Sequence, residues 1–189
     1  MLLQETLKKF VDIFHKDSGL GKLEYSSEKL LDNSTLELTG EIKEFYQHLS
    51  FERKCYFTGS PYDIALIPSS LLGKAIEGWQ DLNWNSSYVI FAHLMGDEPI
   101  FCDMNNNYCP VYGIFPGDPK LYKLSDSLNE FLLIYIKLKE IEINLFNNNV
   151  YTDENFSNYK ENYVSTILET IKNNVPKELC DDFREFMFG

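Results

Sequence analysis

Apolar residues near the N-terminus recur at helical spacing. Five of them repeat at i, i+4, i+7, i+8 and i+11, and they are Leu3, Leu7, Phe10, Val11 and Phe14. This pattern predicts an amphipathic helix over residues 2–16 with one buried face. Apolar positions three and four apart predict a second helix over residues 39–49.

The middle of the chain changes to short apolar runs. An extended segment at 62–68 and a short helix at 71–77 come first. Three runs follow, at residues 88–94, 99–102 and 109–115. Gly96-Asp97 and residues 103–107 separate them, and Gly and Asn tolerate the left-handed backbone of tight turns. The centre is therefore predicted to be an antiparallel meander.

Helical spacing returns in the last third. Ser127 and Glu130 form a capping-box pattern, which predicts that a helix over 127–138 covers one face of the sheet. Residues 147–158 are rich in Asn, Asp and Ser and read as a loop. Two further amphipathic helices, the second beginning at Pro176, form a C-terminal extension over about 156–188.

Length and composition support one packed domain. The chain has 189 residues, of which 44% are apolar and 15% aromatic, so it can bury a full core. No segment has the composition of a linker. We predict a single α+β domain over residues 1–189, with a twisted, mainly antiparallel sheet flanked by helices.

The charge balance narrows the choice of partners. Lys and Arg number 17 against 29 Asp and Glu, which gives a formal net charge of −12. No basic run is present to neutralise phosphates, so nucleic acid and anionic membranes are not expected as partners. A negative field speeds encounter with a basic protein. The other interpretation is that acidity only maintains solubility.

The N-terminus and the cysteines favour the cytoplasm. The first residues lack a basic start followed by an apolar stretch, so no secretory signal is expected. The longest apolar run, 131–136, is far shorter than a membrane span. Four cysteines without a CxxC pair are expected to be free thiols, and they are Cys55, Cys102, Cys109 and Cys180.

Residues 84–133 resemble the signature region of the SUKH superfamily. Its elements appear here in order as Trp84, the strand 88–93, Gly96-Asp97, the strand 100–103, Pro110-Val111 and the helix 127–132. With the upstream helix, the resemblance covers residues 38–138. Tyr122 stands where many members have Trp, and Pro116-Gly117 stands where some have His-Gly, which leaves the subfamily open.

The resemblance implies a protein-binding platform. Bacterial members are mostly immunity proteins that block a cognate toxin, often a nuclease or a deaminase, and fungal members are scaffolds that regulate cell-wall assembly. We therefore predict a non-catalytic, cytoplasmic bacterial immunity protein without a cofactor that covers the active site of a basic toxin. The oligomeric state stays open, and a monomer is favoured. The alternative is a regulatory scaffold. Fold alone does not settle function.

Acidic turn residues and the two tryptophans are the candidate contact residues. Acids would pair with Lys or Arg of a toxin, and a Trp flanked by acids is a suitable interface anchor. The structural alternative places both tryptophans in the core at the sheet edge. The candidate partner-binding residues are Glu77, Trp79, Asp81, Trp84, Asp97, Glu98, Asp103 and Asp118.

Catalysis is the weaker alternative. Asp97, Glu98, Asp103 and Asp118 could hold Mg²⁺ or act as acid and base, although turn geometry alone favours Asp at such positions. A thiol nucleophile would need His93 as a base beside Cys102 or Cys109. A zinc site needs about four ligands, and His93, Cys102 and Cys109 supply at most three. We expect no catalytic residue and no metal. Whether the two cysteines pair across the hairpin stays open.

Overall fold

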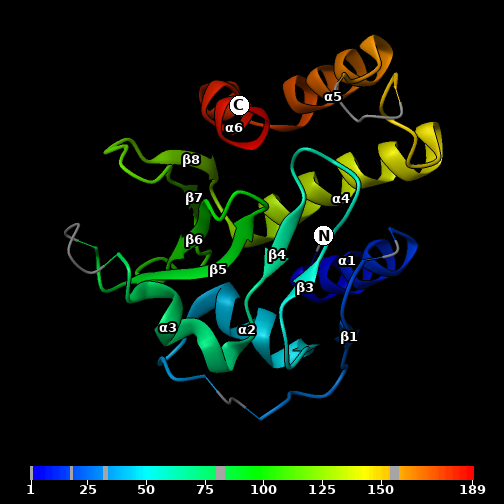
Figure 1. Cartoon of the computed structure of the whole chain (residues 1–189). Helices are drawn as coiled ribbons and strands as arrows, with labels where there is room; N and C mark the ends of the chain where they lie inside the picture. The colour runs from blue at the N-terminus through cyan, green and yellow to red at the C-terminus, as the bar shows by residue number, and fades with distance from the viewer. Residues whose placement is uncertain (1, 18, 32–33, 80–83, 154–157) are drawn as a thin grey trace.

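A six-stranded antiparallel sheet forms the centre of the protein (Figure 1). The computed structural model describes residues 2–17, 19–31, 34–79, 84–153 and 158–189. In spatial order the strands are β3 (Cys55–Tyr56), β4 (Ile64–Leu66), β5 (Tyr88–Leu94), β6 (Pro99–Asp103), β7 (Val111–Gly113) and β8 (Tyr122–Ser125). Each strand pairs with the next one in the sequence, as a meander requires. A second, two-stranded sheet joins β1 (Glu24–Tyr25) to β2 (Leu49–Ser50).

The three predicted strands of the centre are present, and one is shorter than expected. The run 109–115 contributes only β7, because Cys109 takes a left-handed backbone with φ of 51° and Pro110 has no N–H for a ladder. The turn between β5 and β6 also differs from expectation. Asp97, rather than Gly96, adopts the left-handed conformation, with φ of 67°.

The register separates the side chains of the sheet into two faces. Val89, Cys102 and Val111 lie opposite one another and form the inner face. Phe101 pairs with Tyr112 on the other face, which we call the outer face. A register shift between Ile90 and Ala92 forms a bulge at Phe91.

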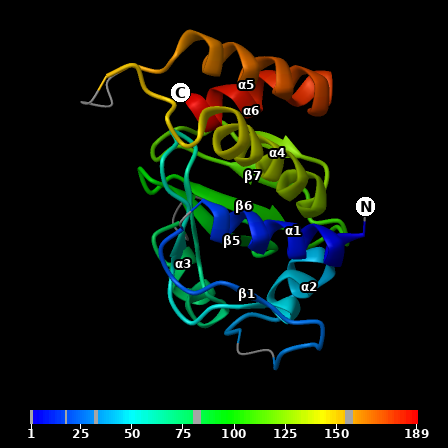
Figure 2. The same cartoon turned by 90° about the vertical axis from the view of Figure 1, so that its right-hand side faces the viewer.

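Helices cover the inner face (Figure 2). They are α1 (Leu3–Lys16), α2 (Gly40–His48) and α4 (Leu128–Phe146), and Phe91 contacts both Phe45 of α2 and Phe131 of α4 at ring-centroid distances of 6.0 Å. The Ser127 hydroxyl accepts a hydrogen bond from the Glu130 N–H at 3.0 Å, which confirms the predicted start of α4. The helix continues eight residues beyond 138.

The C-terminal helices dock on this layer and on the sheet. They are α5 (Glu161–Asn174) and α6 (Cys180–Phe188), and η3 (Lys177–Leu179) directly precedes α6. Between β4 and β5 the chain also forms η1 (Ser69–Leu71) and α3 (Leu72–Ile76). Phe186 of α6 lies against Gly113 and Tyr122, and α5 packs on α4. The chain thus forms one compact α+β domain, as predicted. Among the residues that are described, no helix is long and apolar enough to cross a membrane.

Candidate functional site

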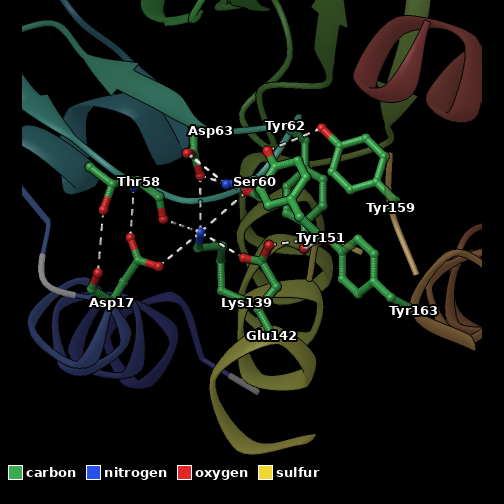
Figure 3. Close-up of polar contacts among 10 residues, drawn as sticks. All are labelled: Asp17, Thr58, Ser60, Tyr62, Asp63, Lys139, Glu142, Tyr151, Tyr159 and Tyr163. Atoms are coloured by element: carbon green, nitrogen blue, oxygen red, sulfur yellow. Dashed lines mark hydrogen bonds and ion pairs between the residues drawn. The ribbon is translucent and has the colours of Figure 1, made fainter. Parts of the chain in front are cut away.

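Lys139 of α4 is completely buried and makes ion pairs with three carboxyl groups (Figure 3). Its Nζ lies 2.8 Å from Asp17 Oδ1, 2.9 Å from Asp63 Oδ1 and 2.7 Å from Glu142 Oε2. Asp17 follows the last residue of α1, Asp63 precedes β4, and Glu142 is one turn further along α4. These four residues, the Lys139 cluster, therefore join three elements through one buried charge.

The Lys139 cluster has more acceptors than its ammonium group can satisfy. The Thr58 carbonyl at 3.2 Å and the Ser60 hydroxyl at 3.3 Å also contact Nζ, so five oxygens compete for its three N–H groups. One cation also faces three carboxyl groups. A proton held by one carboxyl group would relieve both imbalances, because it removes a negative charge and adds a donor.

Burial shifts the pKa values of two carboxyl groups in this cluster. It raises the pKa of Glu142 to about 7, against the attraction of Lys139, and it also raises the pKa of Asp17. Burial alone would lower the pKa of Lys139, but the fields of Glu142, Asp63 and Asp17 outweigh it and raise that pKa. Lys139 therefore stays charged, and Glu142 titrates near neutrality.

Tyr163 extends the cluster to α5. Its hydroxyl donates to Glu142 Oε1 at 3.0 Å and lies 3.3 Å from the hydroxyl of Tyr62. The side chains of Lys139 and Asp17 are 0% exposed and that of Glu142 is 2% exposed, so a substrate does not reach the charged atoms. We assign the Lys139 cluster a structural role. The sequence carries a signal for it, since Lys139 and Glu142 continue the apolar stripe through Leu128 and Tyr135 at helical spacing.

The exposed candidate site is a groove of about 410 Å³ beside the outer face, which we call the tryptophan groove. Its lining residues are Trp79, Trp84, Asn85, Tyr88, Ile114, Gly117, Asp118, Pro119 and Leu121. Residues 84–87, directly before β5, and the loop between β7 and β8 both lie to the left of the sheet in Figure 1. These two segments form the walls.

The aromatic wall of the groove is anchored on the sheet. The ring of Trp84 lies 4.8 Å from that of Phe101 and 5.5 Å from that of Tyr88, measured between centroids. Its Nε1 donates to the Tyr88 carbonyl at 3.3 Å. Trp79 lies 5.8 Å from Trp84 and is also partly buried. Both tryptophans thus pack against the core, as the structural alternative predicts, and they also line the groove. Their role as interface anchors stays a prediction.

Asp118 places a carboxylate in this groove. Its Oδ1 accepts from the Lys120 backbone N–H at 2.9 Å, and its Oδ2 accepts from the Tyr122 hydroxyl at 3.1 Å. The Lys120 ammonium group pairs instead with Asp182 at 3.0 Å and Glu185 at 2.8 Å in α6. Within the described part of the chain, no Lys or Arg forms an ion pair with Asp118.

The structure brings together some of the predicted contact residues. Trp79, Trp84 and Asp118 meet in the groove, although 34 positions separate the last two in the sequence. Asp103 pairs with Tyr88 across the strands and so flanks the groove, and Glu77 is exposed at the end of α3.

Of the described predicted residues, Glu77, Asp97, Glu98 and Asp103 are not among those that line the groove. Asp97 and Glu98 lie in the turn at the other end of β5 from Tyr88. Asp81 lies outside the described residues.

The structure separates the residues proposed for chemistry. Asp97 and Glu98 precede β6 and Asp103 ends it, so the strand keeps these acids apart. His93 pairs with Pro99 whereas Cys102 pairs with Val89. Among the residues that the structure describes, no group of three or more His, Cys, Asp or Glu side chains is arranged to hold a metal ion.

Cys102 and Cys109 are neighbouring buried thiols rather than a disulfide. Burial raises the pKa of Cys102 well above its usual value, and a hydrogen bond between the two thiols adds to this. The same hydrogen bond lowers the pKa of Cys109. Neither thiol is exposed to a substrate.

The structure is an α+β domain with a groove lined by two tryptophans and the carboxylate of Asp118. A scan against protein-family models found no match, and searches of curated proteins and of solved structures found none either. Membership of the SUKH superfamily therefore stays a prediction from the residues at 84–133.

Proposed function

We propose that this protein is a non-catalytic binding module for a basic protein, and that it acts as an immunity protein by covering the active site of a toxin. The tryptophan groove carries this proposal, because it combines Trp79, Trp84 and an unneutralised Asp118 on a chain with net charge −12. Aromatic side chains bordered by polar groups dominate binding energy at protein interfaces. A negative surface speeds encounter with a basic partner.

The surroundings of the groove support the same partner. On the outer face, the partly exposed rings of Tyr88 and Tyr112 stack with centroids 6.2 Å apart. The lysines beside this face are already neutralised within the chain, since Lys120 pairs with acids of α6 and Lys123 pairs with Asp126. The region therefore presents aromatic surface with an excess of negative charge, which favours Lys and Arg on the partner.

The resemblance to the SUKH superfamily adds the second support. It suggests an immunity protein, and within the same superfamily it also suggests a regulatory scaffold. These two functions differ in their partner. We favour the immunity function, with a toxin as the partner, because an acidic surface that binds a basic protein suits the neutralisation of a nuclease or a deaminase.

Co-expression with the protein encoded by the adjacent gene tests the proposal. We expect the two proteins to co-purify, and we expect this chain to restore growth of cells that express the neighbour. The variant Trp84→Ala/Asp118→Asn should lose both effects, while Asp97→Asn should keep them. A neighbour that is harmless to cells but still forms the complex would point to the scaffold function. Absence of both complex and protection would overturn the proposal.

A further inference from the structure

We infer that the tryptophan groove is a receptor for one arginine side chain of the protein partner. This inference rests on the proposed function in one respect, namely that the partner is a protein. It adds the chemical group that the groove recognises. Three features of the groove carry it: the aromatic wall, the free acceptor capacity of Asp118 and the apolar floor.

The aromatic wall suits a flat cation. Trp79, Trp84 and Tyr88 line the same groove, with Trp84 held against Tyr88 and Phe101. A guanidinium group stacks on aromatic faces, and tryptophan gives the strongest cation–π attraction. Because Trp84 is fixed by its packing and by its hydrogen bond to Tyr88, little side-chain entropy is lost when a cation binds.

Asp118 supplies the matching charge. A carboxylate offers about four lone-pair sites, and the structure uses one on each oxygen for Lys120 N–H and Tyr122 O–H. One site on each oxygen remains for a forked donor. The two existing hydrogen bonds also hold the carboxylate in place, which favours the bidentate geometry of an arginine.

The remaining walls fit the rest of the side chain. Ile114, Pro119 and Leu121 can pack against the methylene groups of an arginine. A volume of about 410 Å³ admits one long side chain with its neighbouring backbone. The same chemistry occurs next to the groove within the chain, because Lys120 lies 4.1 Å above the ring of Tyr122 beside acids of α6.

Intrinsic fluorescence gives a direct test, because the chain contains two tryptophans and both line the groove. The probe is the tripeptide acetyl-Gly-Arg-Gly-amide, titrated against the protein at low salt. The control peptide carries citrulline, which keeps the shape of arginine without its charge. We expect a saturable change with a dissociation constant on the order of millimolar, and binding at least about tenfold weaker for citrulline.

Variants assign the effect to the groove. Asp118→Asn should weaken binding of the arginine peptide by about tenfold, since it removes the charge and keeps the shape. Asp97→Asn is the matched control, because it lies outside the groove in a left-handed position that Asn also tolerates, and it should leave binding unchanged. Circular dichroism would check that both variants remain folded. Equal binding of citrulline and arginine, or equal losses in the two variants, would overturn the inference.

Failure of this inference is distinguishable from failure of the proposed function. If the neighbouring protein binds and the arginine peptide does not, the groove is not an arginine receptor although the chain still binds a protein. If the arginine peptide binds and no protein complex or protection is found, the receptor stands and the immunity function fails.

Discussion

Lys139 carries a positive charge into an interior that it shares with three carboxyl groups. Such a network is not a net source of stability, because each charge loses its hydration on folding. Its effect is seen when one member is removed, since the others then remain buried without a partner. The five oxygens around Nζ come from the C-terminal end of α1, the β3–β4 segment and α4. Removal of the ammonium group would therefore destabilise the packing of all three elements.

Replacing this lysine should therefore destabilise the protein strongly. We expect Lys139→Met, which keeps the length of the side chain, to lower the free energy of unfolding by about 3–5 kcal/mol. Urea denaturation at pH 7 measures this. Lys137→Met, an exposed position on the same helix, should cost less than about 0.5 kcal/mol. A loss below about 1 kcal/mol for Lys139→Met would contradict the role assigned to the cluster.

Glu142 should make stability fall as the pH rises towards neutrality. Its pKa is about 7 in the folded protein against a usual 4.5, so the folded state holds an extra proton between these values. Its stabilising contribution is complete below pH 4.5 and is lost as the pH rises through 7. At about 1.4 kcal/mol per pKa unit, the shift corresponds to at most about 3–4 kcal/mol.

Glu142→Gln tests this pH dependence. The variant imitates the protonated side chain, so its free energy of unfolding relative to the parent should increase between pH 4.5 and 7.5. Urea denaturation across this range gives the difference. Glu140→Gln, on the exposed side of α4, should follow the parent. Parallel curves for Glu142→Gln and the parent would show that Glu142 is ionised throughout.

At the scale of elements, the sequence predicts a helix or strand correctly where the hydrophobic pattern continues over many residues. Helices α1 and α2 and strand β5 end within one or two residues of the predicted ranges, because several apolar positions repeat in each. The sequence pattern does not predict strands β3 and β8, because segments of two and four residues are too short to show a period.

The candidate site was predictable only in part. The sequence predicts Trp84 as a candidate contact residue because it is an aromatic residue near acids, and Asp118 because it is an acid in a turn. The sequence does not predict that Trp84 and Asp118 line the same groove, because this depends on how the β7–β8 loop folds beside the outer face. The sequence prediction does not include Lys139 and Glu142, because the predicted helix ends at 138 whereas α4 continues to Phe146. Charges on an apolar stripe would indicate a buried ion pair.

Gly113 should control the docking of α6. A Cβ atom there would lie 2.3 Å from the ring of Phe186, so the ring and its helix must move. We expect Gly113→Ala to cost about 1–3 kcal/mol and to speed amide exchange in α6. Gly78→Ala, where a Cβ would meet no atom within 4 Å, is the control. Unchanged exchange in α6 would show that this contact does not fix the helix.

At the scale of the whole molecule, a net charge of −12 should act on the rate of association. We expect the association rate with the neighbouring protein to fall about tenfold or more as salt rises from 50 to 500 mM, because ions screen the attraction. The dissociation rate should change much less. Surface plasmon resonance at several salt concentrations measures both. An association rate that is independent of salt would exclude electrostatic steering.

Hydrogen exchange, measured for the free protein and for its complex with the protein encoded by the adjacent gene, locates the binding surface. Binding through the tryptophan groove should slow exchange in peptides that cover residues 84–90 and 110–121 and leave α5 unchanged. Slowed exchange confined to α1 or α5, with the groove peptides unaltered, would show that the partner binds elsewhere.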